Sequence, residues 1–81
     1  MKYIATFYSH FGAIRFKKLC ETQNIAAKIM PVPRDLSSSC GTCVKCEGEL
    51  IAFDEIHADE VEQIAEITNT GYQIIYRAKN S

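Results

Sequence analysis

The sequence predicts an α+β domain of the ferredoxin-like βαββαβ type, a two-layer sandwich with two helices on one face of a four-stranded antiparallel sheet. The main observation is the order of its segments: strand-like and helix-like patterns follow one another as strand, helix, strand, strand, helix, strand. The second observation is length, because 81 residues suffice for one small core. We therefore expect a single domain over residues 1–81.

The first half of the chain supplies a strand, a helix and a second strand. Residues 2–8 are apolar on both alternating faces, which is typical of a central strand covered on both sides. Ser9 is a suitable N-cap for a helix over residues 10–22, and Asn24 suits the left-handed conformation that often follows a helix. Residues 25–30 alternate again, and the closing Pro31 and Pro33 favour an edge position for this strand.

The second half has a less regular pattern. Residues 42–47 predict a short third strand, and residues 48–57 show no clear period. Residues 59–69 predict an amphipathic helix, after which Thr70 and Gly71 turn the chain into a last strand over residues 72–77. The helix prediction rests on four apolar positions: Val61, Ile64, Ala65 and Ile67.

A two-layer sandwich leaves one sheet face bare, and this predicts self-association. The first strand is apolar on that face too, and Tyr72, Ile74 and Tyr76 share one face of the last strand. Large exposed apolar patches are unusual in monomers, and a twofold dimer is the commonest way to bury one. We therefore expect a homodimer, unless residues 48–57 fold across the bare face instead.

Composition argues against several classes of partner. The net charge is −1, so no basic field points to nucleic acid or to an anionic membrane surface. No apolar run approaches the roughly 20 residues that span a bilayer. The start of the chain lacks a signal-peptide core, so we expect a cytoplasmic location. In that reducing compartment, clustered cysteines favour thiol or metal chemistry over a disulfide framework.

The cysteines mark the candidate site. Three of the four lie within seven positions, between the second and third strands, and Cys40 and Cys43 form a CxxC pair. Such a pair serves as a redox couple, as half of a zinc site, or as a nucleophilic thiol with a resolving partner. In the predicted topology, the first helix begins at the same end of the sheet. Its N-terminal dipole and Arg34 would favour a thiolate on Cys40.

A metal centre is the weaker interpretation of these cysteines. Its ligands would be Cys40, Cys43, Cys46 and His10, bound to zinc or copper. On a strand, however, Cys46 faces away from Cys43, and a core position suits it better. Cys20 lies about ten residues down the helix, roughly 15 Å from its start, and we expect it to be out of reach of the other three cysteines. We therefore expect no resident metal and no cofactor.

The residues around the CxxC pair complete the candidate site. Ser38 and Ser39 precede Cys40, and Gly41 follows it, as suits an accessible turn. Serine hydroxyls and backbone amides of such a turn can bind an anion or a sulfur or selenium atom on Cys40. His10 is a surface or capping residue in the simplest interpretation, and a member of the site in the functional one.

At these residues the sequence resembles the selenium/sulfur (Se/S) carrier-like family of small bacterial domains. The specific part of the resemblance is the proline pair followed by serines and the CxxC motif. Beyond residue 49, the likeness is only in overall pattern. The matching segments are residues 3–7, residues 9–14, residues 30–34 and residues 37–44.

The resemblance implies a carrier that holds sulfur or selenium as a persulfide or selenopersulfide on the motif cysteine. Cys40 would carry the terminal atom, and Cys43 could resolve it by forming a disulfide. Donor and acceptor proteins of the transfer would be the partners, and the protein would be a carrier more than an enzyme. A small CxxC module that binds zinc or copper, or a thiol-redox module, is the alternative.

Overall fold

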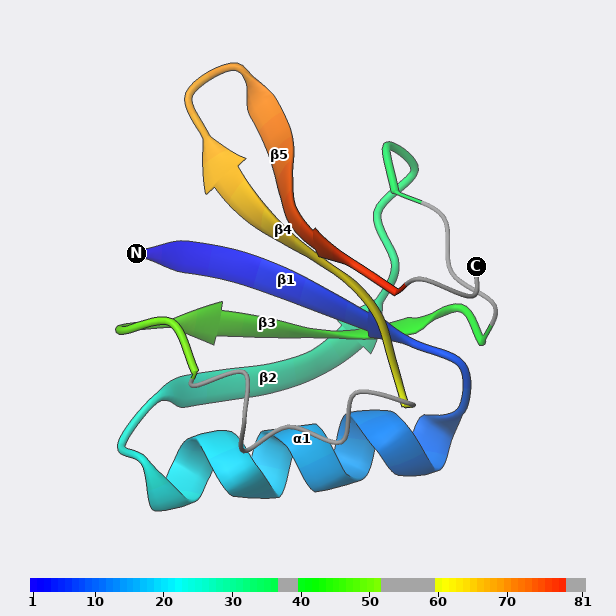
Figure 1. Cartoon of the computed structure of the whole chain (residues 1–81), viewed down its shortest axis with the longest axis vertical. Helices are drawn as coiled ribbons and strands as arrows, with labels where there is room; N and C mark the ends of the chain where they lie inside the picture. The colour runs from blue at the N-terminus through cyan, green and yellow to red at the C-terminus, as the bar shows by residue number, and fades with distance from the viewer. Residues whose placement is uncertain (37–39, 52–59, 79–81) are drawn as a thin grey trace.

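The computed structural model describes residues 1–36, 40–51 and 60–78. Within these ranges the fold is one helix packed on one face of a five-stranded antiparallel sheet (Figure 1). The strand order across the sheet is β2-β3-β1-β4-β5. The elements are β1 (Lys2–Phe7), α1 (His10–Thr22), β2 (Ala26–Pro31), β3 (Thr42–Glu47), β4 (Val61–Thr68) and β5 (Gly71–Arg77).

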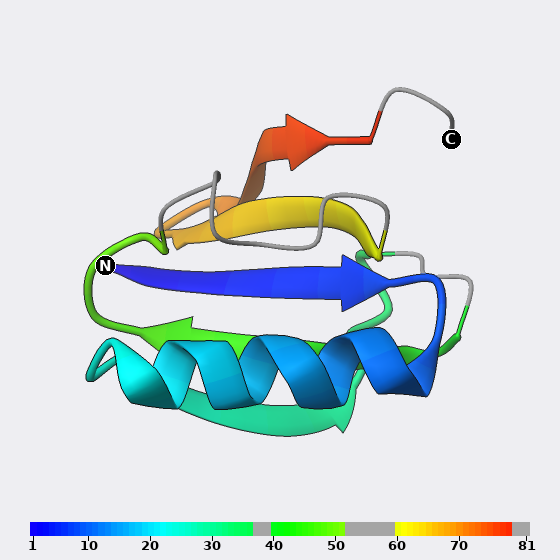
Figure 2. The same ribbon diagram turned by 60° about the horizontal axis from the view of Figure 1, so that its bottom comes forward.

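The first half of the chain folds as its pattern predicts. β1 is central, and all its residues from Tyr3 to Phe7 are buried. Ser9 is the N-cap of α1, and Asn24 has φ 60°, in the left-handed region. β2, closed by Pro31, forms one edge of the sheet. Figure 2 shows α1 running alongside β1, β3 and β2, the strands that it contacts.

The ferredoxin-like fold expected from the sequence is wrong. Residues 61–68, expected within a second helix, form strand β4, which pairs with β1 on one side and β5 on the other. The sheet therefore has five strands, and α1 is the only helix among the described residues. Ile51 belongs to the buried core, and Leu50 is partly buried against it.

The helical spacing in β4 has a structural cause. Val61 pairs with Phe7 and Ile64 pairs with Ala5, so two residues three apart on β4 face partners two apart on β1. An irregularity of the register between Thr6 and Phe7, a β-bulge, absorbs the extra residue. A bulge thus places residues i and i+3 on one face of a strand, which is also the signature of a helix.

The core lies mainly between α1 and the sheet. On this face the aromatic rings of Phe7 and Phe16 lie 5.2 Å apart, and Tyr3, Val44 and Cys46 are buried with them. The face of the sheet opposite α1 is also buried at its centre. The almost fully enclosed residues there are Ile4, Thr6, Cys43 and Ala65.

Both faces of β1 are thus covered within one chain. β1 therefore does not contribute to the bare apolar face on which we expected a second copy to dock. In β5, Ile74 keeps an exposed side chain. Residues 52–57 of the segment that could have covered this face lie outside the described residues. In the part of the chain that the structure describes, no helix has the length and apolar character needed to cross a membrane.

Candidate functional site

The connection that carries Cys40 is tied by backbone hydrogen bonds. Val32 N donates to the Gly41 carbonyl over 3.1 Å, which joins the end of β2 to the start of β3. Leu36 N donates to the Pro33 carbonyl over 3.1 Å and forms a turn over residues 33–36. Gly41 has φ 74°, a left-handed conformation that glycine adopts without steric cost. The chain therefore turns sharply directly after Cys40.

Cys40 is the most accessible of the four cysteines. It is half-buried, whereas Cys20, Cys43 and Cys46 are buried, and no disulfide joins any of them. Its Sγ lies 3.5 Å from the Thr42 carbonyl oxygen, and its side chain packs against the edge of the helix-side core. A reactant from solution therefore reaches Cys40 more directly than any other cysteine.

Cys43 is held in a protonated form beneath this turn. It pairs with Thr6 on the sheet face opposite α1, and its side chain has no exposed surface. Its Sγ donates to the Pro31 carbonyl over 3.6 Å. Burial, and next the nearby charge of Cys40, raise the pKa of Cys43 to about 11. At neutral pH the Cys43 thiolate is therefore scarce.

His10 joins the start of α1 to the cysteine turn. Its Nδ1 lies 2.9 Å from Thr42 Oγ1, in a hydrogen bond whose direction depends on the tautomer of the ring. The expectation that the helix start and the cysteine turn share one end of the sheet is confirmed. Thr42 was not among the predicted site residues. Its position directly before Cys43, at the start of β3, is the signal that could have indicated it.

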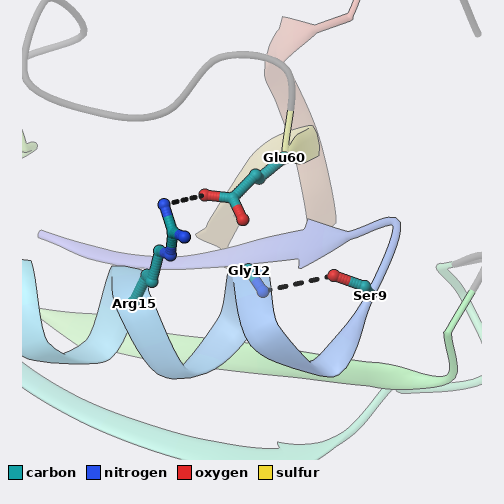
Figure 3. Close-up of polar contacts among 4 residues, drawn as sticks. All are labelled: Ser9, Gly12, Arg15 and Glu60. Atoms are coloured by element: carbon teal, nitrogen blue, oxygen red, sulfur yellow. Dashed lines mark hydrogen bonds and ion pairs between the residues drawn. The ribbon is translucent and has the colours of Figure 1, made fainter.

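The N-terminal half of α1 is also attached to Glu60, the residue directly before β4 (Figure 3). Ser9 Oγ accepts from Gly12 N over 3.3 Å, and Arg15 forms an ion pair with Glu60 Oε1 at 3.6 Å. Tyr8 N donates to the Glu60 carbonyl over 3.3 Å. A Cβ on Gly12 would lie 3.2 Å from the Cβ of Glu60, so glycine permits this close approach. These contacts hold the N-terminal half of α1 against the residue that precedes β4.

Cys20 and Cys46 form a separate contact inside the core. Their Sγ atoms lie 3.8 Å apart, and neither residue has exposed surface. Cys46 lies in the core, as its position on β3 predicted, but the expectation that Cys20 is remote from all other cysteines is wrong. Because β3 runs antiparallel to β1, its far end returns to the end of the sheet where α1 ends.

The remaining predicted residues are only partly placed. Arg34 is exposed in the turn over residues 33–36, and Ser38 and Ser39 lie outside the described residues. Cys43 and Cys46 face opposite sides of β3, as their spacing predicted. Within residues 1–36, 40–51 and 60–78, no three side chains of His, Cys, Asp or Glu gather as a metal-binding group.

Comparison with known families adds the decisive observation. A family model described as "Putative Se/S carrier protein-like" matches residues 2–77, from the start of β1 to the end of β5. The chain belongs to this family. The match includes the second half, where the resemblance lay only in overall pattern. Neither a curated protein nor a solved structure matches the chain.

Proposed function

We propose that this protein carries sulfur or selenium as a persulfide or selenopersulfide on Cys40 and delivers it to an acceptor protein. The chain belongs to the Se/S carrier-like family, and the observation that carries the proposal is the burial of its cysteines. Cys40 is half-buried, whereas the other three cysteines are buried. A carrier thiol must meet two partners in turn, which requires a sulfur at the surface. Cys40 meets that requirement at the turn before β3.

Loading and delivery are two transfers of the same sulfur atom. The Cys40 thiolate attacks the terminal sulfur of a donor persulfide; a new S–S bond forms on Cys40, and the donor leaves as its thiolate. A thiolate of the acceptor then attacks the terminal sulfur on Cys40, and Cys40 leaves as a thiolate again. Each transfer exchanges one S–S bond for another, so no external oxidant or reductant is consumed.

Cys43 governs how long the loaded state lasts. If the Cys43 thiolate attacks Cys40 Sγ, hydrosulfide leaves and a Cys40–Cys43 disulfide forms, which discharges the carrier. With a pKa of about 11, only about one Cys43 in ten thousand is ionised at neutral pH. The buried position of Cys43 slows the attack further. Cys43 is thus a slow resolving thiol, and the persulfide persists until an acceptor arrives.

The test is loading of the reduced protein with sodium polysulfide, followed by intact-mass spectrometry without reductant. We expect a gain of about 32 Da for one sulfur, and about 80 Da when a selenium donor is used. Trypsin isolates Cys40 and Cys43 in the peptide of residues 35–45, so the added mass can be located. Cys40→Ser should abolish loading, whereas Cys20→Ala, the control, should load like the wild type.

Cys43→Ala tests whether the second cysteine of the pair acts as a resolving thiol. This variant should load to the same extent as the wild type and keep the added sulfur longer, because disulfide formation is removed. Loading of Cys40→Ser to the wild-type level would overturn the carrier role of Cys40. Faster loss of sulfur from Cys43→Ala than from the wild type would overturn the resolving role of Cys43.

A further inference from the structure

We infer that Cys20 and Cys46 are a second thiol pair, which oxidation converts to a disulfide that joins the last turn of α1 to the end of β3. The two sulfur atoms are 3.8 Å apart, already in contact. A disulfide bond is about 2.05 Å long, so the atoms must approach by roughly 2 Å, which side-chain rotation and small backbone shifts can supply.

The sheet separates this pair from Cys43, and the length of β3 separates it from Cys40, which precedes that strand. Cys43 lies on the face opposite α1, while Cys46 lies on the α1 face, three residues further along β3. Three residues of a strand span about 10 Å. Exchange between Cys43 and Cys46 would require attack through the sheet, and exchange with Cys40 would have to cover the length of β3. The two pairs can therefore be in different oxidation states in the same molecule.

The surroundings of the pair decide which thiol reacts first. The hydrogen bond between the two sulfur groups lowers the pKa of Cys20, whereas it raises the pKa of Cys46, with burial acting in the same direction on Cys46. The Tyr3 hydroxyl beside Cys46 is held in place, since it donates to the Glu49 carbonyl at 3.0 Å and accepts from Ile51 N at 3.1 Å. Cys20 is accordingly the thiol that ionises first.

With a peroxide as oxidant, the reaction balances in two steps. The Cys20 thiolate attacks one oxygen of hydrogen peroxide, which forms a sulfenic acid and releases hydroxide. Cys46 then attacks the Cys20 sulfur, the S–O bond breaks, and water leaves as the disulfide forms. In total, two thiols and one peroxide give one disulfide and two water molecules.

The disulfide would close a covalent loop over residues 20–46, which contains β2 and the turn with Cys40. A loop of this length restricts the unfolded chain and raises the stability of the native state if the native geometry accepts the bond. Two buried cysteines that served only as small apolar residues would not need their sulfur atoms in contact. Oxidation would thus strengthen the scaffold that holds Cys40 without consuming Cys40.

The experiment uses the full chain with Cys40→Ser and Cys43→Ala combined, so that only Cys20 and Cys46 can react. After hydrogen peroxide treatment, the intact mass should fall by about 2 Da. Trypsin cuts after Lys18, Lys28, Lys45 and Arg77, so a disulfide should link the peptides of residues 19–28 and 46–77. The Tm should rise by about 10 °C and return to its initial value with dithiothreitol.

A third substitution, Cys20→Ala, is the control and should abolish both the mass loss and the rise in Tm. The wild type gives an independent answer if the double variant does not fold, because trypsin places Cys40 and Cys43 together in the separate peptide of residues 35–45. Full alkylation of Cys20 and Cys46 after peroxide treatment would overturn the inference. A linked pair that lowers the Tm would overturn it too.

Discussion

His10 Nδ1 and Thr42 Oγ1 lie 2.9 Å apart, although 32 positions separate them in the chain. The contact joins the first residue of α1 to the first residue of β3, next to Cys40 and Cys43. It gives His10 a structural role that holds whether or not the imidazole also takes part in transfer. The contact links the cysteine turn directly to the helix N-terminus.

This contact can be measured by a double-mutant cycle on unfolding in urea. His10→Ala and Thr42→Val should each lower the free energy of unfolding, because each removes one partner of the same hydrogen bond. We expect a coupling energy of about 0.5 kcal/mol, since the contact is exposed to water. The control cycle pairs His10→Ala with Thr70→Val, at the hairpin turn between β4 and β5, and should be additive. Additivity in the His10–Thr42 cycle would contradict the contact.

The four cysteines should differ in their rates of alkylation. Cys40 should react with iodoacetamide at least about tenfold faster than Cys20, Cys43 or Cys46, because those three react only when the structure opens. Tryptic mapping after short exposure resolves Cys20, Cys46 and the Cys40–Cys43 peptide, and Cys43→Ala assigns the signal within that peptide. Equal rates for Cys40 and Cys20 at neutral pH would refute the accessible-thiol interpretation.

Ionisation of the Cys43 thiol should lower the free energy of unfolding at alkaline pH. The pKa of the Cys43 thiol is about 11 in the folded protein, compared with 9.0 for an ordinary cysteine thiol. Between these values the thiol stays protonated in the folded state but ionises in the unfolded chain. The contribution is complete below about pH 9 and is lost as the pH rises through about 11. Across this window the wild type should lose about 2 kcal/mol more than Cys43→Ala, since two pKa units correspond to about 2.7 kcal/mol.

This difference can be measured by urea unfolding of the two proteins at about pH 8 and about pH 11. The raised pKa values of Tyr3 and Cys46 act in the same direction in both proteins and largely cancel in the comparison. Parallel losses of stability in the wild type and in Cys43→Ala would show that Cys43 ionises equally in the folded and unfolded states.

Protein purified without oxygen should contain zinc and iron well below one ion per chain. Cys43 and Cys46 face opposite sides of β3, and Cys20 and Cys46 are enclosed in the core, so these cysteines do not converge on one point. Tetrahedral zinc requires four converging ligands. Elemental analysis of the wild type beside Cys40→Ser is the measurement. One zinc or iron per chain, absent from Cys40→Ser, would establish the metal-binding alternative.

Local signals in the sequence were sufficient for the first half of the fold. Ser9 before an amphipathic segment located the start of α1, and Asn24 located the turn after its end. The apolar character of both faces of residues 2–8 indicated a central strand, and Pro31 indicated an edge strand. Each of these features depends on groups within a few residues, so the chain itself contains the information.

The second half depended on contacts between distant residues. Val61 and Ile64 have helical spacing, yet pairing with β1 makes them a strand, and the bulge that reconciles the spacing exists only in the paired sheet. Burial of β4 on both faces also removed the alternation by which strands are detected. The family match covers this half but does not specify its secondary structure.

The candidate site divides in the same way. The spacing of residues along the chain was enough to predict that the thiols cluster in a turn after Pro31, that this turn lies near the start of α1, and that Cys46 faces the core. Three features became visible in the folded chain alone: Cys43 is buried and hard to ionise, His10 contacts Thr42, and Cys20 lies against Cys46. The reason is physical: accessibility, pKa and sulfur contacts depend on which distant segments pack together, whereas turns and caps depend on neighbours along the chain.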